Sequence, residues 1–192
     1  MANRCTRIPS ILFPKEGTDL SKWAVIACDQ YTSQPDYWEE TDRTVGDAPS
    51  TLRLTLPEVY LEDADVADRT AIIHRTMQDY MQNGTLRPLP AGVVLTERWS
   101  GGNCPRRGVV LAVDLEAYEY TAGSASLIRP TEKTVVERIP PRLKVRQGAC
   151  IELPHIMILI DDPGRRIIEP LFDKTASFSK LYDTDLMQNG GH

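Results

Sequence analysis

The segment from Asp63 to Gly84 reads DADVADRTAIIHRTMQDYMQNG and holds the clearest periodic pattern of the chain. Residues suited to the buried face of a helix recur in it at spacings of four, three, four and three: Val66, Thr70, Ile73, Met77 and Tyr80. This spacing places them on one side of an α-helix. Asp63 or Asp65 can cap its start, and Asn83-Gly84 supplies a stop. We therefore predict an amphipathic helix around which the fold is organised.

Three further elements are predicted on the N-terminal side of this helix. The short apolar run at residues 23–28 is typical of a buried strand. A second helix is expected to start at Pro35, with Ser33 as its cap, and to end near Gly46. In residues 51–56 three leucines alternate with polar side chains. That alternation predicts a half-buried strand.

The C-terminal side of the helix is predicted to begin with a hairpin. Residues 92–99 and 108–113 read as strands, and the Gly- and Pro-containing residues 100–105 read as the loop between them. A short helix is expected to follow Pro140 and to end at Gly148.

Residues 155–160, which read HIMILI, give the strongest buried-strand signal of the chain. The turn residues after them predict that residues 165–170 return as the second strand of a hairpin. Residues 179–187 are a further strand candidate, followed by a turn at Asn189-Gly190.

These elements predict a single α/β (α+β) domain over residues 1–192, with a mixed, largely antiparallel sheet and flanking helices. The turn at Asn189-Gly190 is not followed by a returning strand. We therefore expect the chain to be the N-terminal part of a longer protein, with a mobile tail as the alternative.

The charge balance limits the classes of partner. The chain carries 27 acidic and 22 basic side chains, a formal net charge of -5, which argues against a general nucleic-acid binder. No apolar run approaches the roughly 20 residues of a membrane-spanning helix, and residues 1–14 do not resemble a signal peptide. The four cysteines are scattered without a C-x-x-C pair, which predicts reduced thiols, no metal site and a cytoplasmic location.

The most promising chemistry lies in residues 126–134, since the chain has no P-loop, G-x-S-x-G or H-E-x-x-H motif. There Glu132 could accept a proton from a substrate hydroxyl. Cations nearby and downstream could offset phosphate charge: Arg129, Lys133, Arg138, Arg142 and Arg146. Asp29 is a further candidate by position alone, because ligands often bind where a strand ends. The residue chemistry by itself favours an ordinary solvated loop.

Four stretches point to a family. The chain contains LSKWAVIACDQY at residues 20–31, GDAPSTLR at 46–53, SLIRPTE at 126–132 and LMQNGGH at 186–192. In this order they resemble domain-of-unknown-function family 1015. The resemblance implies a relationship to ParB-like proteins, and to kinases that phosphorylate free L-serine with ADP or ATP and magnesium.

The same resemblance assigns roles to residues. Glu132 would act on the serine hydroxyl, with Thr131 where those kinases have histidine. Together with the residue chemistry, the resemblance gives four candidate substrate- and phosphate-binding residues: Arg129, Thr131, Thr134 and Arg138. Asp29 joins them by its position alone. The kinases also hold phosphates with an Asp-Gly-x-His-Arg-like loop, and this sequence contains no Asp-Gly-x-His. We therefore expect little turnover from this chain by itself.

Two function classes remain open. The first is a small-molecule kinase relative. The second is a non-catalytic ligand-binding or regulatory module of the same fold, which Thr131 favours slightly. Both imply a small-molecule ligand rather than a membrane or nucleic acid. DNA binding by analogy with ParB is weak, because the chain is acidic.

Overall fold

The longest helix of the structure is α3, Val66–Gln82, at the position that the sequence predicts. The computed structural model describes residues 5–119, 121–131, 135–153 and 155–192. The other helices are α1 (Leu20–Trp23), α2 (Pro35–Val45), α4 (Ile139–Arg146) and α5 (Glu169–Phe172). Short 3-10 helices are η1 (Thr51–Leu54), η2 (Glu58–Tyr60), η3 (Leu115–Ala117), η4 (Val136–Arg138), η5 (Thr175–Ser177) and η6 (Met187–Asn189).

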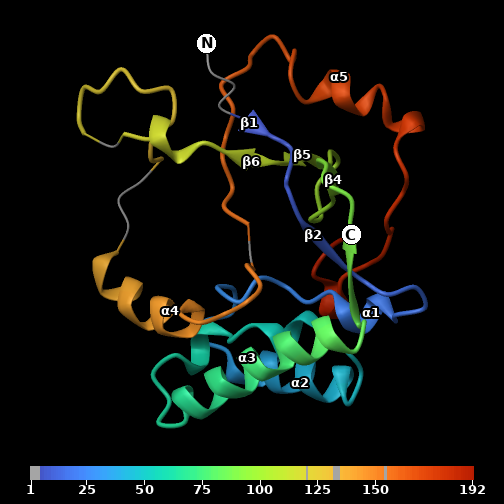
Figure 1. Cartoon of the computed structure of the whole chain (residues 1–192), viewed down its shortest axis with the longest axis vertical. Helices are drawn as coiled ribbons and strands as arrows, with labels where there is room; N and C mark the ends of the chain where they lie inside the picture. The colour runs from blue at the N-terminus through green and yellow to red at the C-terminus, as the bar shows by residue number, and fades with distance from the viewer. Residues whose placement is uncertain (1–4, 120, 132–134, 154) are drawn as a thin grey trace.

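The strands form three antiparallel pairs in the part of the chain that the structure describes. They are β1 (Cys5–Thr6) with β6 (Ala112–Val113), β2 (Ile11–Pro14) with β3 (Leu86–Leu89), and β4 (Val94–Arg98) with β5 (Arg106–Val110). In Figure 1, α1, α2 and α3 lie together at one end, and α5 lies at the opposite end. The fold is therefore a mixed α/β arrangement with short antiparallel sheets and several helices, as predicted.

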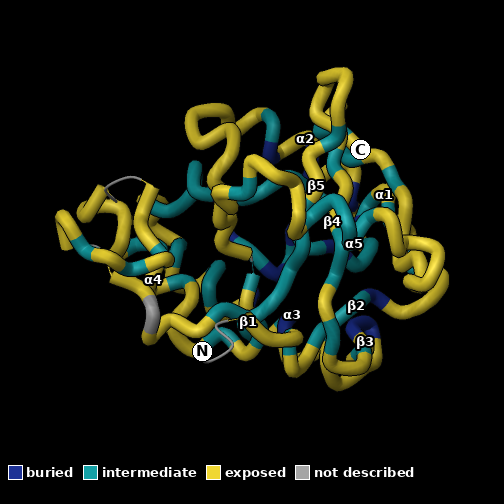
Figure 2. The backbone as a smooth tube through the Cα atoms, turned by 90° about the horizontal axis from the view of Figure 1, so that it is seen from above, coloured by how far each residue is buried: buried dark blue, intermediate teal, exposed yellow. Residues whose placement is uncertain are grey.

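The core is built by the segments around α3. One cluster contains Trp23, Leu54, Leu56, Ile73, Met77 and Leu86, and a second contains Trp38, Val45 and Leu52. Every buried residue in the described ranges lies between Pro14 and Leu86. In Figure 2 dark blue segments lie beside α3, β2 and β3, and most of the tube is teal or yellow. The apolar face of α3 thus packs mainly against elements close to it in sequence.

Several predicted elements are confirmed. Helix α2 starts at Pro35 and is followed by Gly46, the hairpin of β4 and β5 forms around its loop, and α4 ends before Gly148. The predicted cap Ser33 is wrong, because Gln34 occupies the N-cap position of α2. Asp65 occupies the N-cap position of α3 as predicted, but its side chain makes no capping hydrogen bond. The Asp65 carboxylate instead accepts a hydrogen bond from Arg69, 2.9 Å away.

Two predicted strands near the core are wrong. Residues 23–28 contain the last residue of α1 and then an irregular segment. The side chain of Asp19 caps the N-terminus of α1, and the helix takes up Trp23 before the chain becomes extended at Ala24. The carbonyl of Trp23 accepts a hydrogen bond from Thr51 Oγ1 at 2.8 Å, not from a neighbouring strand. Residues 51–56 begin as η1, because the Ser50 hydroxyl accepts a hydrogen bond from the Leu52 N–H. Local capping thus overrides the strand pattern.

The C-terminal predictions are also corrected. Residues 155–160 are irregular and exposed instead of forming a buried strand. Residues 165–170 do not return beside them, because Asp162 Oδ2 accepts hydrogen bonds from the N–H groups of Arg166 and Ile167 and closes a local turn that leads into α5. Residues 179–187 form no strand either.

The predicted Asn-Gly turn is confirmed. Gln188 and Asn189 have φ angles of 54° and 58°, and the Leu186 N–H donates to the Gly191 carbonyl at 2.7 Å. Within the described ranges, no helix is both long and apolar enough for a membrane crossing.

Candidate functional site

The candidate loop comprises residues 121–138. Its described parts, residues 121–131 and 135–138, lie on the surface between η3 and α4. Its central residues Glu132 and Thr134, with Lys133, lie outside the described residues, so their predicted roles stay predictions. Of the other candidates, Arg129 and Thr131 are exposed before this gap, and Arg138 is exposed after it at the end of η4.

The N-terminal side of the loop is fixed by backbone and hydroxyl contacts. A parallel bridge joins Tyr118 to Ile128. The Ser126 hydroxyl donates to the Ile128 carbonyl at 3.1 Å and accepts from the Ile128 N–H at 3.3 Å. Arg129 Nε donates to the Ser126 carbonyl at 2.7 Å, so the start of this side chain folds over its own loop. These contacts hold Arg129 at the base of the candidate loop.

The C-terminal side of the loop is fixed by an ion pair that we call the Glu58–Arg142 pair. Arg142 on α4 approaches the Glu58 carboxylate with two guanidinium nitrogens, at 2.6 Å and 2.9 Å. The Glu58 side chain is only 11 % exposed. The hydrogen bond to Glu58 raises the pKa of Arg142, and so keeps it charged. This pair attaches α4, and with it Arg138, to η2.

Asp29 lies beside the Glu58–Arg142 pair. The Glu58 N–H donates to the Cys28 carbonyl at 2.9 Å, which brings the turn that carries Asp29 next to η2. The charge of Asp29 contributes to the raised pKa of Arg142, so the two groups are in electrostatic range. The structure therefore brings one predicted site residue, Asp29, to the helix that follows the candidate loop.

Cys28 is not suited to act as a nucleophile at this place. Burial raises the pKa of its thiol, and the charges of Asp29 and Glu58 act in the same direction. A hydrogen bond with Thr55 opposes these effects. A raised pKa lowers the thiolate fraction at neutral pH.

Two of the predicted phosphate-binding cations are already engaged. Arg142 binds Glu58, and Arg146 pairs with Glu152. Arg129 and Arg138, by contrast, form no ion pair with any residue in the described ranges. The sequence pattern missed this division, because Glu58 lies 84 residues from Arg142.

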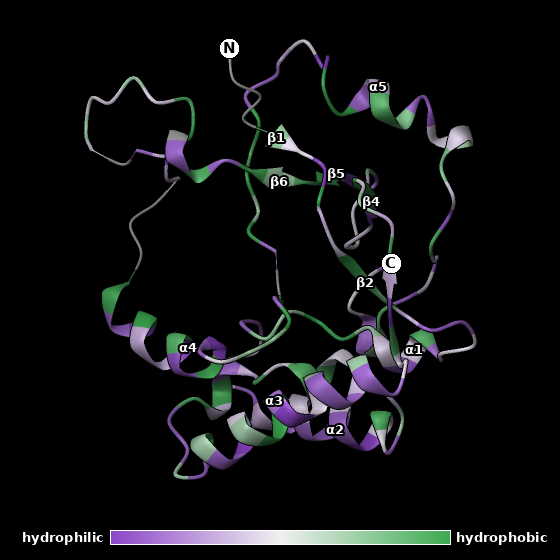
Figure 3. Cartoon of the chain, viewed as in Figure 1, coloured by the Kyte–Doolittle hydropathy of each residue, from purple (hydrophilic) through white to green (hydrophobic). Residues whose placement is uncertain are grey.

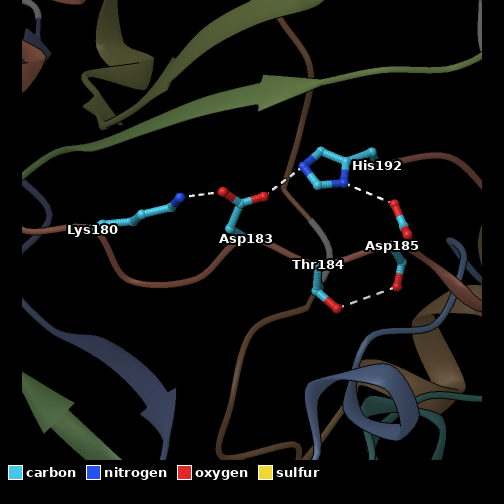
Figure 4. A network of polar contacts seen from close by, with 5 residues as sticks. All are labelled: Lys180, Asp183, Thr184, Asp185 and His192. Carbon is cyan, nitrogen blue, oxygen red and sulfur yellow. Dashed lines mark hydrogen bonds and ion pairs between the residues drawn. The ribbon is translucent and has the colours of Figure 1, made fainter.

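A second polar cluster lies in the C-terminal segment (Figure 4). His192 Nε2 is 2.6 Å from Asp183 Oδ1, and His192 Nδ1 is 2.8 Å from Asp185 Oδ1. Lys180 also binds Asp183. The contact with Asp185 is the largest cause of the raised pKa of His192, and Lys180 is the largest cause of the lowered pKa of Asp183. Sequence reasoning missed this cluster, although the predicted turn at Asn189-Gly190 leads His192 back toward it.

The backbone of His192 completes the contacts of this segment. Its N–H donates to the Trp99 carbonyl at 2.9 Å, and its carbonyl accepts from the Trp99 N–H at 2.7 Å. The Gln188 side chain donates to Thr41 Oγ1 on α2 at 2.7 Å. These contacts dock the C-terminal segment on α2 and on Trp99, the residue after β4.

An open hollow of about 370 Å³ lies between β4, β5 and α5 and is lined by Glu97, Arg107, Phe172, Asp173 and Thr175. The Arg107 guanidinium lies 4.8 Å above the Phe172 ring and binds Glu97 at 2.8 Å. Arg107, the cation that lines this hollow, is therefore already paired with a carboxylate. No group of three or more His, Cys, Asp or Glu side chains suited to a metal ion occurs in the ranges that the structure describes.

Together these features define a mixed α/β protein with an exposed segment of hydroxyls and cations, whose C-terminal side is attached to η2 through the Glu58–Arg142 pair. The chain belongs to the family described as protein of unknown function (DUF1015), which matches residues 12–192. The match spans most of the chain, including all four stretches on which the resemblance rests.

Neither the curated proteins nor the solved structures contain a match to the chain. The family match is therefore the finding that relates this chain to other proteins.

Proposed function

We propose that the chain contributes the hydroxyl-activating part of a small-molecule kinase site, and that residues 129–138 of the candidate loop form that part. The observation that carries the proposal is the position of Arg129 and Arg138, two exposed cations on either side of Glu132 that form no ion pair within the described ranges. The resemblance to kinases of free L-serine supplies the acceptor, L-serine, and the donor, ADP or ATP with magnesium.

The two arginines on either side of Glu132 in the sequence fit the phosphate part of a nucleotide. Guanidinium groups bind phosphate oxygens through paired hydrogen bonds, and the side chains of Arg129 and Arg138 are exposed to solvent, where a nucleotide can reach them. Magnesium in such sites is held mainly by phosphate oxygens and water with one or two carboxylates, so a cluster of three protein ligands is not required. When bound, magnesium would neutralise charge on the transferred phosphoryl group.

In the proposed mechanism the chain's own residues position and deprotonate the acceptor. Glu132 orients the serine hydroxyl and accepts its proton as the phosphoryl group is transferred. Arg129 and Arg138 bind the phosphate oxygens and offset their charge. Thr131 and Thr134 supply hydroxyl groups for the substrate. Asp29 would interact with the amino group of L-serine, because it is an exposed carboxylate in electrostatic range of Arg142 on α4.

The test is formation of O-phosphoserine from L-serine by the natural gene product, measured by mass spectrometry. Glu132→Gln is expected to abolish turnover without changing the circular dichroism spectrum. Glu137→Gln is the matched control, because Glu137 is an exposed glutamate of η4 with no proposed role. Equal turnover by wild type and Glu132→Gln would refute the assignment of Glu132.

A second candidate function is a ligand-binding module without catalysis. Thr131 supports it, because a threonine cannot replace a histidine in proton transfer at neutral pH. Thermal unfolding of this chain with L-serine, ADP and ATP, each with and without magnesium, detects binding. A ligand at a hundred times its dissociation constant adds about 2.7 kcal/mol to the stability. Stabilisation without O-phosphoserine formation would favour the binding module.

A further inference from the structure

The run Ile156–Ile160 is the longest exposed apolar segment of the described chain. Its five side chains are exposed by 87 %, 68 %, 53 %, 72 % and 47 % in sequence order. Figure 3 shows it as part of an extended green trace that leads away from α4 without a strand arrow. The side chain of Met157 receives one weak contact, from Arg106 Nη1 at 3.8 Å. Large apolar surfaces of this kind mark interaction sites.

The backbone of this run is open as well. Among the described residues, one backbone hydrogen bond reaches residues 155–160, from the Asp162 N–H to the Ile160 carbonyl. Ile and Met side chains alternate between the two faces of an extended chain, so both faces of this run are apolar. An extended apolar segment with unpaired N–H and C=O groups is a template for another strand.

We infer that Ile156–Ile160 pairs with the same run of a second copy of this chain, as an antiparallel two-stranded ladder with its two-fold axis at Ile158. In this register Ile156 faces Ile160, Met157 faces Leu159, and Ile158 faces its own copy. The order Ile-Met-Ile-Leu-Ile is nearly the same in both directions, as an isologous contact requires.

The polar residues at the ends of the run favour this arrangement. The antiparallel register places His155 of each copy opposite Asp161 of the other, at both ends of the ladder. An imidazole N–H can donate a hydrogen bond to the facing carboxylate, whereas two carboxylates that face each other repel. A parallel pairing in register would instead place Asp161 opposite Asp161. The ends of the run therefore favour a two-fold antiparallel contact.

The expected association is weak and depends on concentration, because a two-stranded ribbon alone is only marginally stable in water. Sedimentation of the whole chain over a range of concentrations is expected to show a reversible equilibrium between monomer and dimer. Ile158→Lys places two like charges on the axis and is expected to raise the dissociation constant at least about a hundredfold. Leu127→Lys is the matched control, since Leu127 is 80 % exposed outside the run, and the dimer should persist.

A charge exchange tests the register. His155→Asp places two carboxylates opposite each other at each end of the ladder and is expected to weaken the dimer. Adding Asp161→His restores a pair of one histidine and one aspartate at each end of the ladder, and is expected to recover most of the affinity. Circular dichroism confirms that each variant is folded.

Two results would overturn the inference. One is a wild-type chain that stays monomeric up to its solubility limit, which would mean that a different strand covers the run. The other is a dimer that is unaffected by Ile158→Lys, because the contact then lies elsewhere.

Discussion

Residues 14–86 and residues 87–192 differ sharply in how their apolar side chains are used. The first region contains every buried residue of the described chain, and none of the described residues in the second region is buried. Yet the most continuous apolar run, Ile156–Ile160, belongs to the second region. Burial thus depends on an opposing surface and not on hydrophobicity alone: α3 faces η1, whereas residues 156–160 face no strand of this chain that the structure describes.

The largest expected effect compares one leucine from each region. Leu54 is 2 % exposed in the main core cluster, so Leu54→Ala is expected to lower the free energy of unfolding by about 2–5 kcal/mol. Leu127 is 80 % exposed, so Leu127→Ala should change it by less than about 0.5 kcal/mol. Urea denaturation measures both. Equal losses would show that the second region is packed as tightly as the first.

The sequence predicts local elements such as α3 better than contacts between distant segments. The period of α3 was sufficient to predict it, because its buried residues are set by positions three and four residues apart. The pairing of β2 with β3 was not predicted, because Leu12 meets Pro88 only once the whole helical region has folded between them. For residues 155–160, apolar composition predicted burial, but composition does not specify a partner.

The candidate site was also predictable only in part. The residue chemistry singled out the loop around Glu132, and the resemblance gave Glu132 its proposed role. The family assignment supports the family part of that resemblance. The Glu58–Arg142 pair was not found, because it joins side chains from distant segments. A single sequence contains no signal for such a contact.

The next effect concerns the Glu58–Arg142 pair, which joins the two regions. Glu58→Gln removes the charge that Arg142 binds, and is expected to cost about 1–2 kcal/mol, less than for a fully buried pair because Arg142 is 42 % exposed. Amide hydrogen exchange should show faster exchange in α4. The matched control is Glu40→Gln, which breaks an exposed pair with Arg43 and should cost about 0.5 kcal/mol or less. Unchanged exchange in α4 would mean that other contacts hold the helix.

A smaller effect is expected where the C-terminal segment docks. Gly191 has a φ angle of +103°, and a Cβ there would lie 2.3 Å from the Trp99 carbonyl oxygen. Gly191→Ala is therefore expected to undock the segment and to speed exchange of the Trp99 amide by about tenfold or more. Gly102→Ala is the control, since nothing lies within 4 Å of its Cβ position. A protected Trp99 amide in Gly191→Ala would contradict the docking geometry.

The smallest effect is a pH dependence of the same docking. The pKa of His192 is raised above 6.5. Its contribution to the stability of the docked segment is therefore complete below pH 6.5 and is lost as the pH rises through the raised value. The pKa of Asp183 is lowered below 3.8, so its contribution is present above pH 3.8 and is lost as the pH falls through the lowered value. Docking is expected to be tightest between pH 3.8 and 6.5.

Nuclear magnetic resonance of the Trp99 amide, corrected for the intrinsic exchange rate, measures this dependence. In His192→Gln the loss of Trp99 amide protection at higher pH should disappear, while the loss of protection at low pH remains. The same high-pH loss in His192→Gln would assign it to another group.

The confinement of buried residues to positions 14–86 has a consequence for the order of events during synthesis. A ribosome releases the N-terminal part of a chain first, and units fold as they emerge. Every buried residue of both core clusters is therefore synthesised before the residues after Leu86. We expect the nascent chain to become resistant to protease before Glu132 leaves the ribosome, so that the candidate loop is added to a scaffold that already exists.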